Sequence, residues 1–444
     1  MFVLREHSRR RFCRWAFVAL CLAPTSAVLG VGIARRWPSV PAAYAEAASR
    51  ELGLRTSIGS VAYPRPGLVV YHDVDIYEGL DSQPLVRCPV LEMAEIGSGV
   101  ALRAPQIELR AQDPTRLGQF VEQHLTERLT QTEGPVRILA DQLTWHSGSR
   151  SQTFSELNGQ FGATTQGAEA TLAFRLAGDE TSEPASLRIV MRRPTLDSTS
   201  RERTLGVTLQ TGGVALPCDT LFPTLDCAAW LGTRATLRGV VWANLVNGRW
   251  QGEISGQLAQ IELESLVSQH FPHTLGGTAQ VQLERAIFDG PRLVEAAGSV
   301  TSMGGTISRS LVQAGRGQLH FDTTAPHPPR EAIIRYQRLA FDFMIDQHGL
   351  KLSGRCPGPA RGTLLADDEH ALWTQPAIQP QPVAALLRTL APGNEILVPA
   401  AESSELLMRH LPLPPLVSPS DPDGREPEPR AKLRVGTQRR DDFR

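Results

Sequence analysis

Three groups of residues in this sequence are of types that could do chemistry. Asp73 and Asp75 lie two apart in a strand-like run, so their carboxylates would share one face of a strand and could ligate a cation. Residues 367–370 form a dense acidic run ending in histidine, but four consecutive side chains cannot all converge on one ion. His270 and His273 have no third ligand nearby in sequence. A solvated strand face, a surface loop and scattered histidines explain these groups more simply, so we expect no metal site.

The sequence carries none of the common catalytic signatures. It has no GxSxG elbow, no HExxH pair, no phosphate loop ending in GK[ST], and no GxGxxG motif opening a helix. Gly304 and Gly305 lie between two strand-like runs, where they predict a turn rather than a phosphate loop. We therefore expect a protein that is not an enzyme, has no catalytic residues and holds no cofactor.

Six cysteines are present, and the sequence leaves their pairing open. Cys218 and Cys227 are near enough in sequence to form a disulfide, which persists in exported proteins, whereas isolated buried thiols are the alternative. No CxxC motif or Cys/His cluster indicates zinc. The other cysteines are Cys13, Cys21, Cys88 and Cys356.

The N-terminus has the composition of a membrane anchor. Residues 1–14 carry an excess of arginine, and residues 15–33 contain no charged residue. A helix of that length reaches roughly 28 Å, close to the hydrocarbon thickness of a bilayer. The basic excess before the segment predicts a cytoplasmic N-terminus, with the bulk of the chain in the periplasm. A cleaved signal peptide is the alternative, because small residues follow Pro24. The side chains expected to contact lipid are Trp15, Phe17, Val18, Leu20, Leu22, Val28, Leu29, Val31 and Ile33.

Beyond the anchor the sequence is dominated by short strand-like runs separated by glycine and proline. About fifteen strands follow one another directly, with few helices between them, which favours antiparallel meanders over a doubly wound sheet. The net charge is -1, so composition predicts no surface for nucleic acid. The expected fold class is mostly β: an N-terminal transmembrane helix, then an elongated, curved, groove-like antiparallel sheet with a few short helices.

The individual elements are predicted by period and by turn residues. Helices are expected at 41–52, 113–129, 216–231, 262–270, 382–390 and 404–410. Asn247-Gly248 predicts a tight hairpin. Strands are expected at 56–63, 68–77, 91–96, 100–109, 136–145, 154–161, 168–176, 186–191, 204–209, 235–245, 248–257, 277–284, 293–301, 317–321, 336–345, 350–353 and 362–365.

Four parts of the chain differ in composition. Residues 1–36 form the basic tail and anchor, residues 37–210 and 211–411 are two β-rich parts, and residues 412–444 are rich in proline and charge. We expect the last part to be a disordered tail, because it has few apolar residues.

One stretch of strand and turn residues follows the anchor and a short helix and comprises residues 52–61, 66–70 and 73–77; a second comprises residues 250–258, 275–281, 298–300 and 304–307. Both stretches resemble AsmA-like proteins, bacterial envelope proteins related to TamB. The resemblance implies an elongated, partly open sheet with an apolar inner groove. It also implies a role in phospholipid transport between membranes or in outer-membrane assembly, with membrane lipids and other envelope proteins as partners.

Burial of an acyl chain on such a sheet is energetically reasonable. At ~0.8 kcal/mol per buried CH₂, a 16-carbon chain gains roughly 12 kcal/mol gross. Strands about 4.8 Å apart would give roughly 70 Å of sheet, so crossing a wider periplasm requires partners. Two alternatives remain: an envelope scaffold that binds proteins through its sheet, and a secreted carbohydrate-active or hydrolytic β-protein with convergent acids in a cleft.

Overall fold

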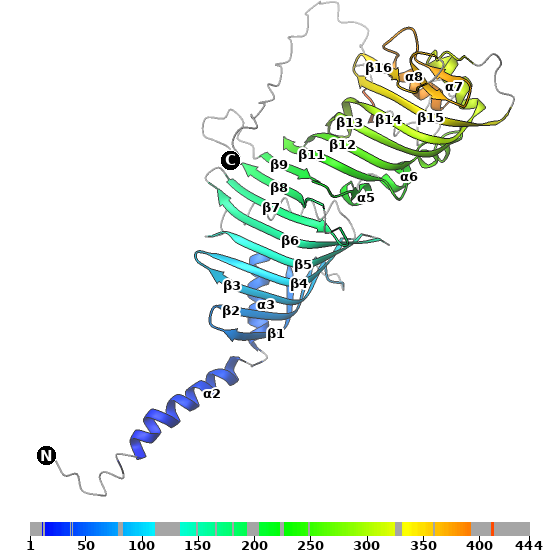
Figure 1. Ribbon diagram of the computed structural model, residues 1–444. Coiled ribbons are helices and arrows are strands. Elements are labelled where there is room, and N and C mark those ends of the chain that lie inside the picture. The colour runs from blue at the N-terminus through cyan, green and yellow to red at the C-terminus, as the bar shows by residue number, and fades with distance from the viewer. Residues whose placement is uncertain are drawn as a thin grey trace, which may run out of the picture.

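Eighteen strands form one open, largely antiparallel sheet, stacked one after another along the molecule (Figure 1). The prediction of a mostly β chain with few short helices is therefore confirmed. This computed structural model describes residues 11, 14–35, 37, 39–78, 83–111, 134–147, 150–164, 167–179, 182–192, 204–222, 226–246, 249–324, 331–357, 360–391 and 410–412.

The first nine strands pair in chain order, each with the next. They are β1 (Arg55–Arg65), β2 (Leu68–Tyr77), β3 (Val86–Ile96), β4 (Gly99–Ala111), β5 (Val136–Ser147), β6 (Arg150–Thr164), β7 (Gly167–Leu176), β8 (Ala185–Arg192) and β9 (Thr204–Gln210).

One pairing corrects the purely antiparallel expectation, because β4 and β5 are parallel. The long connection of residues 112–135 brings the chain back to the end of the sheet at which β4 began, which a short hairpin cannot do. The helix predicted at 113–129 lies in this connection, outside the described residues.

The remaining strands continue the same sheet. β9 pairs with β11, so hydrogen bonding continues across the boundary placed at residue 210, and Val246 pairs with Arg249 as the predicted hairpin requires. β16 and β17 both pair with β15. These strands are β10 (Leu216–Pro217), β11 (Thr236–Val246), β12 (Arg249–Glu262), β13 (Leu275–Asp289), β14 (Arg292–Ser308), β15 (Ile333–Asp346), β16 (Gly349–Gly354), β17 (Thr363–Ala366) and β18 (Ala371–Thr374).

The helices lie at the ends of the sheet and along one long side of it (Figure 1). Predicted helices 41–52 and 382–390 are confirmed as α3 and α8, whereas 216–231 forms only two short helices, α5 and α6. No helix among the described residues is both long enough and apolar enough to cross a bilayer. The bounds are η1 (Val18–Leu22, a π-helical turn), α2 (Ala23–Arg35), α3 (Ser39–Leu52), α5 (Cys218–Leu221), α6 (Cys227–Leu231), η2 (Glu264–Ser268, π-helical), α7 (Arg309–Gln318) and α8 (Val383–Leu390).

Two local predictions are wrong. Residues 317–321 were expected to be a strand, but residues 309–318 form α7, whose N-cap Ser308 accepts a hydrogen bond from the Leu311 amide. Gly304 and Gly305 were expected in a turn, but they lie inside β14, where Gly305 pairs with Tyr336. Glycine residues misled both predictions, because glycine is common in turns and is unfavourable inside both helices and strands.

Strands β1 to β6 share a break in their side-chain alternation at one level of the sheet. In β2, Tyr71 and Val74 are both buried, and Asp73 between them is exposed with φ 53°. Glu156 in β6 also has φ 53°. Such residues bend a strand, as a β-bulge does. We call this line the crease; it consists of Gly59, Asp73, Pro89, Pro105, Asp141 and Glu156.

Candidate functional site

One face of the sheet, which we call the inner face, is apolar from β2 to β16. Residues opposite each other on paired strands point to the same side, so strand register traces this face across the molecule. A single row of cross-strand partners contains no charged or polar side chain. From β2 to β16 this row is Val69, Met93, Leu102, Ile138, Gly159, Leu172, Leu187, Leu209, Val241, Ile254, Ala286, Ala296, Ile345 and Leu350.

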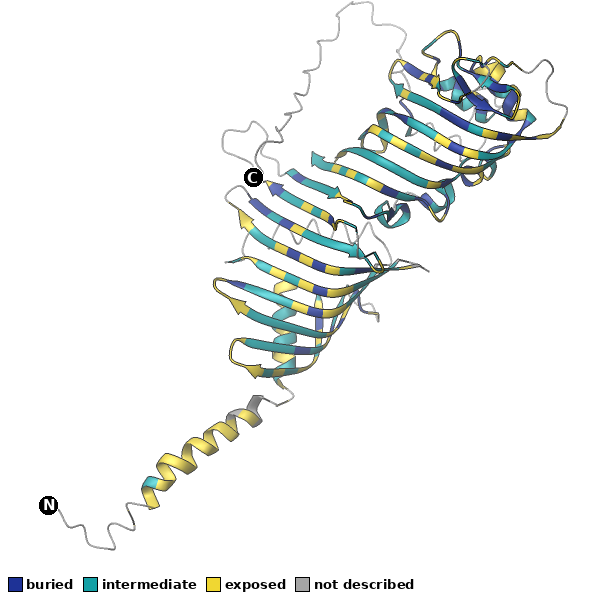
Figure 2. Cartoon of the chain, viewed as in Figure 1, coloured by how far each residue is buried: buried dark blue, intermediate teal, exposed yellow. Residues whose placement is uncertain are grey.

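In the middle of the sheet the inner-face side chains are only half-buried. Leu102, Ile138, Leu187 and Leu283 are all of intermediate exposure, and Trp250 is 43% exposed. Figure 2 shows fully buried residues gathered around the C-terminal helices, whereas the middle strands are mostly intermediate or exposed. An antiparallel sheet normally packs its apolar face against a second layer. Over the middle strands the described residues form only part of such a layer: residues 214–221 pack against Leu172 and Leu209, and α5 and α6 pack against Val241 and Ile254.

The opposite, outer face is polar and carries cross-strand ion pairs. Arg87 Nε lies 3.0 Å from Asp75 Oδ1, and Arg188 Nε lies 2.8 Å from Glu169 Oε1. Surface pairs of this kind contribute little to stability. Their position identifies the face that meets solvent, and it leaves the inner face as the one available to an apolar ligand.

The two aspartates singled out in the sequence do not form a site with each other. Asp75 pairs with Arg87 on the outer face, and Asp73 occupies the crease in a left-handed backbone conformation. Among the described residues, no group of three or more potential metal ligands comes together. The pairing of Asp75 with Arg87 and the place of Asp73 in the crease therefore account for both carboxylates without a bound cation.

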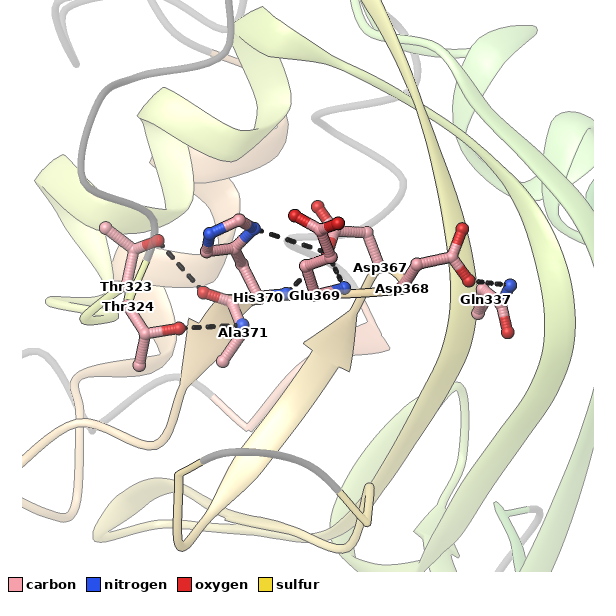
Figure 3. Close-up of polar contacts among 8 residues, drawn as sticks. All are labelled: Thr323, Thr324, Gln337, Asp367, Asp368, Glu369, His370 and Ala371. Carbon is pink, nitrogen blue, oxygen red and sulfur yellow. Dashed lines mark hydrogen bonds and ion pairs between the residues drawn. The ribbon is translucent and has the colours of Figure 1, made fainter.

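The acidic run 367–370 forms a tight turn between β17 and β18 (Figure 3). Asp367 Oδ1 accepts hydrogen bonds from the amides of Glu369 (2.8 Å) and His370 (2.6 Å). Asp368 points the other way and bonds to Gln337. His370 Nδ1 lies 3.8 Å from Asp367 Oδ1, so these two side chains meet while Asp368 points away. An Asx-type turn accounts for the leading aspartate.

The two histidines have separate packing roles. His270 stacks on Trp230 with ring centroids 3.8 Å apart, and its Nε2 lies 3.1 Å from the Ala229 carbonyl oxygen. His273 is buried, with Nδ1 2.9 Å from Ser310 Oγ and Nε2 3.0 Å from the Thr389 carbonyl oxygen. Since a carbonyl only accepts, Nε2 carries the proton and Nδ1 accepts from Ser310. His273 therefore joins the turn after η2 to α7 and α8.

Protonation of His273 is expected to destabilise the protein. Burial is the main cause that lowers the native pKa of His273 below its unfolded value of 6.5, against the opposing effect of the Thr389 carbonyl. The unfolded chain thus binds the proton more tightly. The contribution of neutral His273 to the free energy of unfolding is therefore fully present above pH 6.5 and is lost as the pH falls below that value. Urea unfolding across this range should show the loss in the wild type and in the exposed-site control His348→Gln. The loss of stability at low pH should be smaller in His273→Gln. An unchanged dependence of stability on pH in that variant would show that His273 is not its cause.

Cys218 and Cys227 are both buried thiols in this structure and belong to one apolar cluster with Ala235 and Leu237. Burial is the main cause that raises the pKa of Cys218 to about 12 and that of Cys227 to about 11. Such thiols are almost wholly protonated at neutral pH and react slowly. The disulfide remains a prediction, since the two helices that carry them, α5 and α6, are in contact.

The predicted anchor residues lie on a helical segment that is separate from the sheet (Figure 1). Residues 14–35 are helical throughout. Trp15, Leu20 and Val28 are 73%, 76% and 73% exposed, so they form no core with the sheet. The side chains of Val31 and Ile33 lie outside the described residues. The remaining members, Phe17, Val18, Leu22 and Leu29, are also exposed.

Two further features were not predicted. A surface pocket of about 550 Å³ opens beside the N-terminal end of β5, with Gln160, Thr171 and Glu169 among its lining residues. It is shallow and mixed in polarity, and it has no group of reactive side chains. Trp145 lies on the inner face, and its buried Nε1 donates to no atom of the described structure. A buried tryptophan N–H usually has a partner, so this donor is an unsatisfied polar group.

Comparison with known proteins gives no match for this chain among family models, curated proteins or solved structures.

Proposed function

We propose that this chain is a membrane-anchored protein of the bacterial envelope that holds lipid acyl chains on its inner face. It resembles AsmA-like proteins in this respect. In this proposal the protein binds and transfers lipid or supports outer-membrane assembly, and it does no catalysis. The supporting observation is the uninterrupted apolar row from Val69 to Leu350, which crosses strands far apart in sequence.

Acyl chains fit this face because the binding energy is spread over many residues. Each methylene removed from water contributes ~0.8 kcal/mol, so a ligand needs length along the sheet rather than one polar anchor. The half-buried side chains Leu102, Leu187 and Leu283 would lose their remaining exposure beneath such a chain.

The N-terminal segment supports an anchored orientation. Neither η1 nor α2 alone is long enough to cross a bilayer, but residues 14–35 are helical together, and at 1.5 Å per residue they reach roughly 33 Å, about the thickness of the hydrocarbon core. Within this helix the Thr25 hydroxyl donates to the Cys21 carbonyl oxygen at 2.6 Å, so that hydroxyl needs no water as a partner. α3 and β1 follow directly, which would place the first strands beside the bilayer.

Lipid mass spectrometry of the detergent-extracted, full-length protein tests the proposal. The wild type should retain phospholipid. Val207→Asp places a charge on the inner face of β9, between Ile189 and Ala243, and should strongly reduce the retained lipid. Thr208→Asp is the matched control: it lies one residue along on the outer face, opposite Arg188 and Trp242, and should retain lipid like the wild type.

The comparison requires that both variants stay folded, which circular dichroism and thermal unfolding report. Lipid absent from all three proteins would refute the proposal. Equal lipid in both variants would show that the lipid is held elsewhere.

A protein-binding scaffold is the second candidate. It is favoured by Trp242 and Val240, which are 42% and 38% exposed on the outer face of β11. Trp242→Ser should then abolish recovery of a defined protein partner while leaving retained lipid unchanged. Loss of lipid without loss of the partner would speak against this role for Trp242.

A further inference from the structure

The C-terminal end of the sheet is covered by helices α7 and α8 (Figure 1). α7, α8, β17 and β18, together with residues 319–321, cover the inner face of β15 and β16. Leu319, Phe321, Leu364 and Ala385 form one buried cluster with the inner-face residues of β16, and Phe343 packs against it. We call this assembly the cap.

The inner-face leucines of β16 are more deeply buried than leucines on the same face outside the cap. Leu187 in β8 and Leu283 in β13 are half-buried, but Leu350 and Leu352 in β16 are only 3% and 7% exposed. All four residues point to the same side of the sheet. The face therefore continues under the cap, but its side chains there are already occupied by protein.

The cap is held by specific contacts as well as by apolar packing. Trp373 Nε1 donates to the Val312 carbonyl at 3.3 Å, and the rings of Phe321 and Trp373 lie 5.1 Å apart. His273 joins α7 to α8, as described above. A Cβ on Gly315 would lie 3.0 Å from both Phe321 and Trp373, so these rings already meet the helix backbone closely.

We infer that the inner face is a blind site, in which acyl chains bind between about β4 and β13 and cannot pass beyond the cap. This inference deepens the proposed function and rests on it. As a consequence, lipid leaves the inner face directly, toward solvent or a partner protein, and does not leave along the sheet through its C-terminal end. The chain thus acts as a holder whose C-terminal end is closed rather than as an open-ended conduit.

The test is photo-crosslinking in cells. Aromatic residues of the full-length protein are replaced, one at a time, by the photoreactive analogue benzoylphenylalanine. Phe161 in β6 and Phe288 in β13 are half-buried on the inner face and should form phospholipid adducts. Phe321 is 5% exposed within the cap and should form roughly tenfold fewer adducts. Trp242, on the outer face, supplies the background.

The outcomes separate the two proposals. Adducts at Phe161 and Phe288 but not at Phe321 support a blind site. Equal adducts at all three inner positions overturn it while leaving lipid binding intact, and adducts at none of them refute the proposed function itself. The analogue could itself loosen the cap, so Phe343 is a second capped position, and thermal unfolding must match the wild type for each variant compared.

Discussion

Replacing Gly256 with alanine is expected to destabilise the sheet by about 3 kcal/mol or more, one of the largest single-residue effects in this chain. Gly256 has φ 134°, and a Cβ there would lie 2.1 Å from the Arg238 carbonyl oxygen and 2.6 Å from the Gly239 Cα. These are backbone atoms, so no rotamer change relieves the clash. Because small folded domains are stable by only about 5–15 kcal/mol, much of the molecule's stability is at risk.

The measurement is urea unfolding followed by circular dichroism, with Gly317→Ala as the matched control. Gly317 lies in α7, and a Cβ there would meet nothing within 4 Å. Alanine should therefore stabilise that helix by about 0.5–1 kcal/mol. The same substitution thus has opposite expected signs at the two positions. A shift of equal sign and size at both would show that the close approach of Gly239 and Gly256 is not required.

Replacing both Leu22 and Val28 with arginine is expected to remove the protein from the membrane. Both side chains are exposed in the helical segment, at 54% and 73%, and both would lie near the bilayer centre if residues 15–33 span it. Each arginine there costs about 2.5–3.5 kcal/mol of insertion free energy. The sum is large enough to reverse the partition. Carbonate extraction of bacterial membranes should recover the wild type in the pellet and the double variant in the supernatant.

A double replacement by phenylalanine at the same positions is the control, and it should stay in the pellet. Wild-type protein in the carbonate supernatant would contradict the anchor. Sequencing of the mature N-terminus distinguishes the alternative, because a cleaved signal peptide yields a chain that begins beyond the apolar segment.

Much of the sheet could be predicted from sequence because its strands obey local rules. Residues 73–76 of β2 and 142–146 of β5 alternate clearly, and glycine, proline or asparagine lies between most strands. The short helices α3 and α8 were predictable from apolar residues recurring at helical spacing. These signals need only neighbouring residues, so they survive without knowledge of the tertiary structure.

The crease and the cap could not be predicted, because both depend on contacts between distant segments. Asp73 and Glu156 adopt a conformation that sequence rules reserve mainly for glycine and asparagine, since the neighbouring strands impose it. α7 contains Gly315 and Gly317, which made a strand at 317–321 the better local interpretation. Tertiary packing of Leu311 and Val312 stabilises the helix instead.

The candidate site was predictable in kind but not in extent. Alternation indicated an apolar face on each strand, but only register shows that Leu172, Leu187, Leu209 and Val241 are consecutive cross-strand neighbours. A slip of one residue in any pair would send the next strand's apolar residues to the other side. The closed end of the face depends on α7 and α8, whose docking no local pattern reveals.

The closed end also limits how copies of this protein can assemble. At the other end of the sheet, β1 pairs with β2 and with no other described strand, and on its second edge the Thr56 amide donates to Ser49 Oγ of α3 at 2.9 Å. Another strand could pair only along the rest of that edge. At the capped end, Gln381 already exchanges backbone hydrogen bonds with Leu350. A sheet with a single available edge can join one other sheet and then stops, because the resulting pair has no free edge left. Growth into a fibril through strand addition is therefore blocked at the second step.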